Sequence, residues 1–191
     1  MIKPTTHLLL ICLLLLPLGC NRPSASKTGS TNSASSARYP NLKTQADELT
    51  QASLKGDDAR AADLTYPKLI EVMGGREQYI ENLKAVRGEM QSENFSILSA
   101  SVEDPKDIVE VEKQIYAIVP MTMRMKAPEG ILVGRSSLIG VSSDAGKNWT
   151  FVTANRELKG EALKVLFPAA ADKLRLPEST EPVLERQSPT P

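Results

Sequence analysis

The chain has 191 residues, enough for one domain of ordinary size, and its 23 basic and 23 acidic residues give no net charge. This balance supplies neither the basic face with which proteins usually bind nucleic acid nor a polybasic patch for anionic lipid, so no nucleic-acid partner is expected. Hydrophobic residues make up 41% of the chain and aromatic residues 4%. We therefore expect a folded domain with a mainly aliphatic core.

Residues 1–19 have the pattern of an export signal. Lys3 supplies a positive charge, and an uninterrupted run without charged residues follows from Leu8 to Gly19. This run is shorter than the about 20 residues that a helix needs to cross a bilayer. It is typical of the central region of a signal peptide.

The signal ends in Pro17-Leu18-Gly19-Cys20. A small residue directly before a cysteine resembles the lipobox of bacterial lipoproteins, although that family favours Leu where Pro17 stands and a small residue where Leu18 stands. The resemblance implies cleavage before Cys20 and lipid attachment to it, which would tether the protein to a membrane of the bacterial cell envelope. In that family an Asp after the cysteine often means retention at the inner membrane, so Asn21 favours the outer membrane. The alternative is a plain secretory signal with Cys20 incidental.

The segments on either side of the domain are expected to be unstructured. Residues 20–38 are mostly Ser, Thr, Asn, Ala and Gly without apolar periodicity, and such a segment cannot bury enough surface to offset its ordering entropy. We expect a flexible linker there. Residues 177–191 are rich in proline and charge, which predicts a disordered tail. The folded domain should therefore span residues 39–176.

The first part of this domain has the spacing of helices. Apolar residues recur at helical intervals from Leu42 until Gly56-Asp57-Asp58 interrupts them. Further helices are expected at residues 59–65, 68–73 and 76–91. Pro67 favours the start of the second of these, and Gly74-Gly75 favours its end.

From Phe95 the period changes to two, which is typical of strands. Four strands are predicted, at residues 95–102, 108–126, 131–141 and 149–154, with turns between them. In the long second strand one face is expected to pack on a core while the other mostly sees water. The residues assigned to the packed face are Val109, Val111, Ile115, Ala117, Val119, Met121, Met123 and Met125. A last helix is expected at residues 159–166.

Helices followed by a meander of four strands predict an α+β fold, with the helices on one face of an antiparallel sheet. This order resembles the nuclear transport factor 2-like superfamily, in which helices close a curved, cone-like sheet. The resemblance covers about residues 42–167. It is carried by Lys55-Gly56-Asp57, Tyr66-Pro67-Lys68-Leu69, Gly74-Gly75-Arg76-Glu77 and Trp149-Thr150-Phe151. The superfamily often has a strand before the Gly-Gly helix; none is evident here, so the sheet is expected to be smaller.

Histidine and cysteine restrict the chemistry. His7 and Cys12 lie in the signal, and Cys20 is the expected lipid site, so the mature domain would hold neither residue in usable form. This excludes disulfides, zinc sites built from Cys or His, and Ser-His-Asp or Cys-His catalysis. We expect no metal and no cofactor.

Enzymes of the resembling superfamily, such as ketosteroid isomerase, use Asp, Tyr or His inside the cone. The resemblance thus leaves open an isomerase or dehydratase that acts through Asp63 or one of Tyr66, Tyr79 and Tyr116. A carboxylate in an apolar pocket can serve as a base because desolvation raises its pKa. The alternative is that Asp63 lies on a helix surface and the tyrosines are half-buried aromatics.

Lys113 and Arg135 complete the candidate pocket with these tyrosines, because each interrupts an apolar alternation and could lie at the mouth of the cone. There they would select an acidic ligand, or they are simply long side chains whose stems are buried. The leading hypothesis is a non-catalytic envelope lipoprotein that binds a small apolar ligand or an envelope protein. The enzyme is the second.

Two further patterns are interpreted as structural. The segment from Ser142 to Trp149 resembles the Asp-box hairpin of sialidase-like propellers, but one copy cannot build a propeller. We expect a tight turn in which Asp144 accepts backbone hydrogen bonds, Gly146 takes positive φ and Trp149 packs beneath. The alternating methionines of the long strand could offer thioethers to copper(I), but core packing explains them better.

Overall fold

The structure is a computed structural model that describes residues 38–155, 158–177 and 180–185. The expected signal peptide, Cys20 and the linker up to residue 37 lie outside the described residues. Within the described part no helix is both long enough and apolar enough to cross a membrane.

The helices lie close to their predicted positions. They are α2 (Pro40–Lys55), α3 (Asp58–Asp63), α4 (Pro67–Val72) and α5 (Arg76–Ser92), with α6 (Glu161–Leu166) near the end of the chain. Gly56 ends α2 in the left-handed conformation, φ 71°, and its N–H bonds to the carbonyl of Ala52. Asp57 caps α3 by accepting a hydrogen bond from the Arg60 N–H at 3.1 Å.

The six strands of the described residues form one antiparallel sheet, which confirms the α+β class. The strands are β1 (Ser96–Val102), β2 (Lys106–Val111), β3 (Gln114–Ala127), β4 (Gly130–Ser142), β5 (Thr150–Ala154) and β6 (Val183–Leu184). β3 and β4 pair along almost their full length as a central hairpin. β1 and β2 pair with successive parts of β3, and β5 and β6 with successive parts of β4. Three of the four expected strands are present as β1, β4 and β5, but the expected long strand is divided in two, and the described sheet has six strands.

The predicted long strand at residues 108–126 is wrong, because the chain reverses at Glu112 and Lys113 and divides it into β2 and β3. Glu112 takes φ 56°, the positive value that a primed hairpin turn requires at its first central residue. No Gly or Asn marks this turn in the sequence. Its consequence is that Val109 pairs with Tyr116, so Val109 and Val111 face the side of the sheet opposite to Ile115.

The sheet is covered on both faces rather than on one. On the first face α2 and α3 build a core around Leu42, Val119 and Trp149, all of them almost inaccessible to solvent. On the second face α6 and the segment up to Leu174 build another core around Ile139 and Phe167. The expectation that the second face mostly contacts water was wrong. β4 and β5 carry apolar side chains on both of their faces, as strands buried on two sides do.

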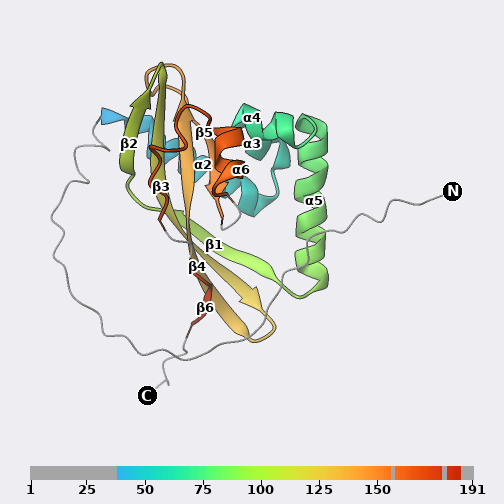
Figure 1. The fold of residues 1–191 in the computed structure, drawn as a ribbon. Helices are drawn as coiled ribbons and strands as arrows, with labels where there is room; N and C mark the ends of the chain where they lie inside the picture. The colour runs from blue at the N-terminus through green and yellow to red at the C-terminus, as the bar shows by residue number, and fades with distance from the viewer. Residues whose placement is uncertain (1–37, 156–157, 178–179, 186–191) are drawn as a thin grey trace, which may run out of the picture.

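Half of the sheet projects beyond the helical layers (Figure 1). β1, the far ends of β3 and β4, and β6 form this projecting half, and α5 stands beside it. β6 arises in the tail that was expected to be disordered: Val183 and Leu184 pair with β4, and the Glu185 N–H donates to the Ile131 carbonyl at 2.7 Å. That part of the tail prediction is therefore corrected, while residues 178–179 and 186–191 lie outside the described residues.

The connection from α3 to α4 closes part of the free edge of β5. The Phe151 N–H donates to the Leu64 carbonyl at 2.8 Å, and the Tyr66 N–H donates to the Phe151 carbonyl at 3.0 Å. Thr65 and Phe151 form a single parallel bridge there. Between the early helices and α5 the described chain has this bridge but no strand, as the sequence indicated.

Candidate functional site

An apolar cavity of about 670 Å³ lies beside β5, with wall residues from the first face of the sheet and from α6 on the second. Its walls come from the second half of α2, from α4 and α5, from β1, β3 and β5, and from α6. Leu83 of α5 faces Ala100 and Met123 of the sheet across it. The cavity exists because α5, which is described along its whole length, buries none of its residues and so leaves room between itself and the sheet.

The walls of the cavity carry no charged side chain among the described residues. Its hydroxyl groups on α2 are bonded within their own helix: Thr50 donates to the Asp47 carbonyl at 2.8 Å, and Ser53 to the Leu49 carbonyl at 3.0 Å. Nowhere in the described chain does a buried side-chain nitrogen or oxygen lack a hydrogen-bond partner. The cavity therefore offers mainly dispersion contacts, and its buried polar groups already have partners within the protein.

Tyr79 is the one residue of the predicted pocket that lines this cavity. Its hydroxyl lies 3.2 Å from the Thr65 hydroxyl, which also donates to the Ala61 carbonyl at 2.8 Å. The pair joins α5 to the segment that follows α3 and is one of the few polar points in a mostly apolar wall.

Tyr66 and Tyr116 belong to the second core instead. Tyr66 stacks on Phe167 with ring centroids 5.3 Å apart, and Tyr116 meets the same ring edge-on at 6.0 Å. Burial raises the pKa of both tyrosines above the ordinary value. Tyr116 bonds to Gln114 at 2.5 Å. Tyr66 and Gln114 line a smaller and more polar hollow of about 430 Å³.

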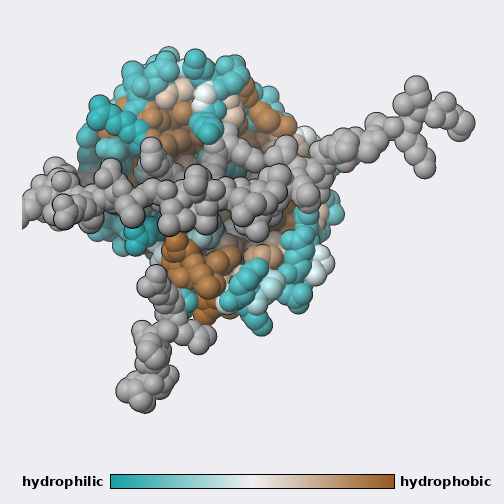
Figure 2. Space-filling view, turned by 60° about the horizontal axis from the view of Figure 1, so that its bottom comes forward, coloured by the Kyte–Doolittle hydropathy of each residue, from teal (hydrophilic) through white to brown (hydrophobic). Residues whose placement is uncertain are grey.

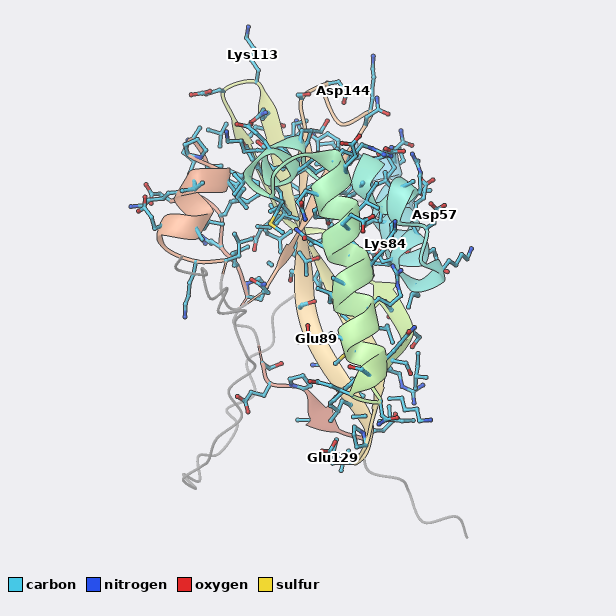
Figure 3. The ribbon with its side chains drawn as sticks, turned by 90° about the vertical axis from the view of Figure 1, so that its right-hand side faces the viewer. Asp57, Lys84, Glu89, Lys113, Glu129 and Asp144 are labelled. Atoms are coloured by element: carbon cyan, nitrogen blue, oxygen red, sulfur yellow. The ribbon has the colours of Figure 1, made fainter. Side chains whose placement is uncertain are left out.

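The two predicted cations do not form a rim around the cavity. Lys113 lies at the tip of the β2–β3 hairpin, at the end of the molecule opposite the β3–β4 turn with Glu129 (Figure 3). Arg135 pairs with Thr122 and so faces the second side of the sheet, away from Leu138 in the cavity wall. The candidate pocket of three tyrosines and two cations is therefore not one site. Alternation indicated which residues share a strand face, but not which face bears the cavity.

Asp63 lies at the surface, where its carboxylate accepts hydrogen bonds from Arg76 at 2.7 and 3.3 Å. Its side chain is 48% exposed and does not line the cavity. Asp63 thus joins α3 to α5.

The Ser142–Trp149 turn has the predicted structure. Asp144 accepts from the N–H groups of Asn148 at 2.9 Å and Lys147 at 3.1 Å, and these bonds, led by that of Asn148, lower the pKa of Asp144 to about 2. Gly146 takes φ 84°, and Trp149 Nε1 donates to its carbonyl at 3.0 Å. The Tyr39 ring lies against Gly146, so the turn anchors the start of α2.

Most of the cavity wall was not identified from the sequence. Leu69, Val72 and Met73 around α4, and Ala162 and Val165 of α6, contribute to it. The sequence offered only a weak signal, namely two short helices with large apolar side chains. In the structure two of these side chains stay exposed, Val72 at 53% and Val165 at 47%. Of the alternating methionines, Met121 and Met123 line the cavity.

Comparison with protein-family models and with curated proteins gives no match for this chain.

Proposed function

We propose that this protein is an envelope lipoprotein, anchored through lipid on Cys20 and located at the outer membrane, whose cone-like domain binds a small apolar ligand without converting it. The observation that carries the proposal is the cavity of about 670 Å³ whose described wall is mostly apolar and uncharged. Its size lies in the range of about 300–1,000 Å³ that is common for ligand sites.

The fold supports this proposal. A curved antiparallel sheet with helices over its first face is compatible with a nuclear transport factor 2-like cone, in which the interior serves as a pocket. Lipid on Cys20 and a linker up to residue 37 would let the domain work at a distance from the membrane.

The enzymatic alternative has narrower support. Of the side chains proposed for it, Tyr79 alone lines the cavity, and within the described wall it is the one ionisable group. Asp63 is paired with Arg76 outside the cavity. A general acid–base reaction needs a group within hydrogen-bond reach of the reacting proton, so Tyr79 is the residue to which such a role would fall.

Binding of a fluorescent apolar probe, phenylnaphthylamine, tests the proposed function. Ala162 is exposed on α6 and lines the cavity, so Ala162→Trp should occupy part of it at little cost in folding. We expect the probe to bind about tenfold more weakly, as if roughly two buried methylene groups were lost. Ala169→Trp is the matched control, because Ala169 is exposed but does not line the cavity. Equal binding by the two variants, or no binding to the native chain, contradicts the proposal.

The anchor is tested separately by the intact mass of the protein extracted from membranes, beside a Cys20→Ala variant. Acyl mass on a chain that starts at Cys20, lost in the variant, is the expected result. A chain without acyl mass would refute the anchor and leave an exported, freely diffusing binding domain.

A further inference from the structure

We infer that the ligand of this cavity is a single flexible acyl chain, of the kind found in fatty alcohols and fatty acids. The inference rests on the proposed function and names the class of ligand. Three features of the cavity carry it: the course of its wall past both faces of β5, the absence of charge from its described wall, and the continuation of the wall, at Ile97, into an apolar row on the projecting half of the sheet.

The cavity bends around the free edge of β5. Its wall includes Phe151 of the first core and Val152 of the second, although adjacent residues of a strand point to opposite faces. One arm lies between α5 and the sheet, with Ile97 and Met123 in its wall. The other arm reaches Leu158 and α6. A rigid, plate-like molecule fits one arm, whereas a chain with free rotation about its bonds can follow both.

Charge complementarity restricts the part of the ligand that enters. The described wall holds no cation that would pair with a carboxylate or phosphate and no anion that would pair with an amine. The buried part of the ligand must therefore be uncharged. A peptide segment fits poorly, because its backbone amides would lose their hydrogen bonds with water and find few partners there. An unbranched hydrocarbon chain brings no polar group into the cavity.

Ile97 of the first arm also belongs to an apolar row on the projecting half of the sheet. Cross-strand register places Ile97, Met125, Leu132 and Leu184 side by side on the first face. Ile97 is 37% exposed and Leu184 52%. Figure 2, turned so that this end comes forward, shows hydrophobic residues reaching the surface on this side. This row extends the apolar path beyond the cavity and gives a longer chain, or its polar head, a way out.

A chain-length series tests the inference on the full-length chain carrying Cys20→Ala, so that lipid on that residue cannot compete. Straight-chain alcohols from octanol to hexadecanol are titrated against bound phenylnaphthylamine, with pyrene and cholesterol as rigid comparators. We expect affinity to rise about two- to fourfold per added methylene until the cavity is full, and then to level off. The rigid compounds should displace the probe less well than the best alcohol.

Blocking each arm sharpens the test. Ala162→Trp fills the arm at α6, and Ile97→Trp narrows the arm at β1. Both should shorten the chain length at which affinity levels off, whereas Ala169→Trp should not. Thermal unfolding of each variant shows that it is folded. If one blocking variant alone has an effect, the ligand occupies one arm and the inference is overturned.

The failures of the two proposals are distinguishable. If the rigid compounds displace the probe and affinity does not depend on chain length, the inference fails while the proposed apolar binding stands. If no probe binds, both fail. The same titration on membrane-extracted protein with Cys20 intact should give unchanged affinities. Loss of alcohol binding there would assign the cavity to the protein's own acyl group and overturn a free chain as the ligand.

Discussion

The part of the molecule around α2 and the part around α5 are held together in different ways. Around α2 the helix buries five of its residues, and Trp149 and Phe151 beneath it are each 1% exposed. α5 buries none, and its Val86 is 56% exposed. α5 has instead polar links to α3 and to Thr65 just beyond it. These links are Asp58–Arg87, Asp63–Arg76 and Thr65–Tyr79. The comparison teaches that the part around α2 is held by a packed core, while the part around α5 leaves apolar surface unburied, where the proposed ligand would bind.

The largest contrast is expected from truncating one apolar side chain in each part. Trp149→Ala should lower the free energy of unfolding by about 3–5 kcal/mol, because it leaves a large cavity in a packed core. Val86→Ala, on the exposed face of α5, should change it by at most about 0.5 kcal/mol. Urea unfolding followed by circular dichroism measures both. Circular dichroism is used because Trp149 is the single tryptophan, so the Trp149→Ala variant has no tryptophan fluorescence. Similar losses would mean that α5 packs as tightly as α2.

Glycines with positive φ give a second contrast. A Cβ at Gly146 would lie 2.3 Å from the Tyr39 ring, whereas a Cβ at Gly75, before α5, would meet nothing within 4 Å. Gly75→Ala should therefore cost about 1 kcal/mol, for backbone strain alone, and Gly146→Ala about 2–4 kcal/mol. Thermal unfolding of the two variants checks this order. Equal costs would show that the Tyr39 contact does not anchor α2.

The links to α5 should differ in strength because they differ in burial. Asp58 is 7% exposed, and its carboxylate binds the Arg87 guanidinium. Asp58→Asn should cost about 1–3 kcal/mol of unfolding free energy. Asp63→Asn, which weakens an exposed pair with Arg76, should cost at most about 1 kcal/mol. Amide hydrogen exchange along α5 would show whether the loss of Asp58 loosens this helix first. Unchanged exchange contradicts the proposed attachment.

The smallest effect concerns how the free energy of unfolding depends on pH through Asp144, in the turn that anchors α2. Hydrogen bonds from the Asn148 backbone and its neighbours lower the pKa of Asp144 to about 2, from 3.8. A lowered native pKa contributes stability that is present above pH 3.8 and lost as pH falls toward about 2, because the unfolded chain binds the proton more readily. Asp144→Asn should therefore flatten the fall of unfolding free energy in this window. Asp172→Asn, at an exposed position, is the control for net charge; an equal flattening there would contradict the assignment.

The sequence predicted the secondary-structure elements better than it predicted the candidate site. The helix expected at residues 76–91 is α5, and the strand expected at 131–141 is β4, because each has a sustained period of one kind. In the turn at Asp144, the backbone hydrogen bonds to Asp144 and the positive φ of Gly146 were predicted, since Asp and Gly at short range decide them locally. The β2–β3 turn was missed because Glu112 takes a positive φ without a glycine or asparagine to mark it.

The site was less accessible to prediction than the fold. The sequence does not distinguish the three candidate tyrosines. In the structure Tyr66 and Tyr116 pack on Phe167, far along the chain, in the second core, whereas Tyr79 lines the cavity. The sequence offered Asp63 as a candidate base, but in the structure its carboxylate pairs with Arg76 of α5. Each outcome depends on a contact between residues that no local pattern joins.

What the sequence by itself determined is the order of the five helices and of β1, β4 and β5, and the mainly aliphatic, histidine-free character of residues 38–155, since periodicity and residue type act over short distances. What only the tertiary structure decided is that both faces of the sheet are covered, that part of the tail pairs with β4, and that the cavity bends around β5. The physical reason is that these features follow from register and packing between distant segments, which are selected by their mutual burial and not by the pattern of any one of them.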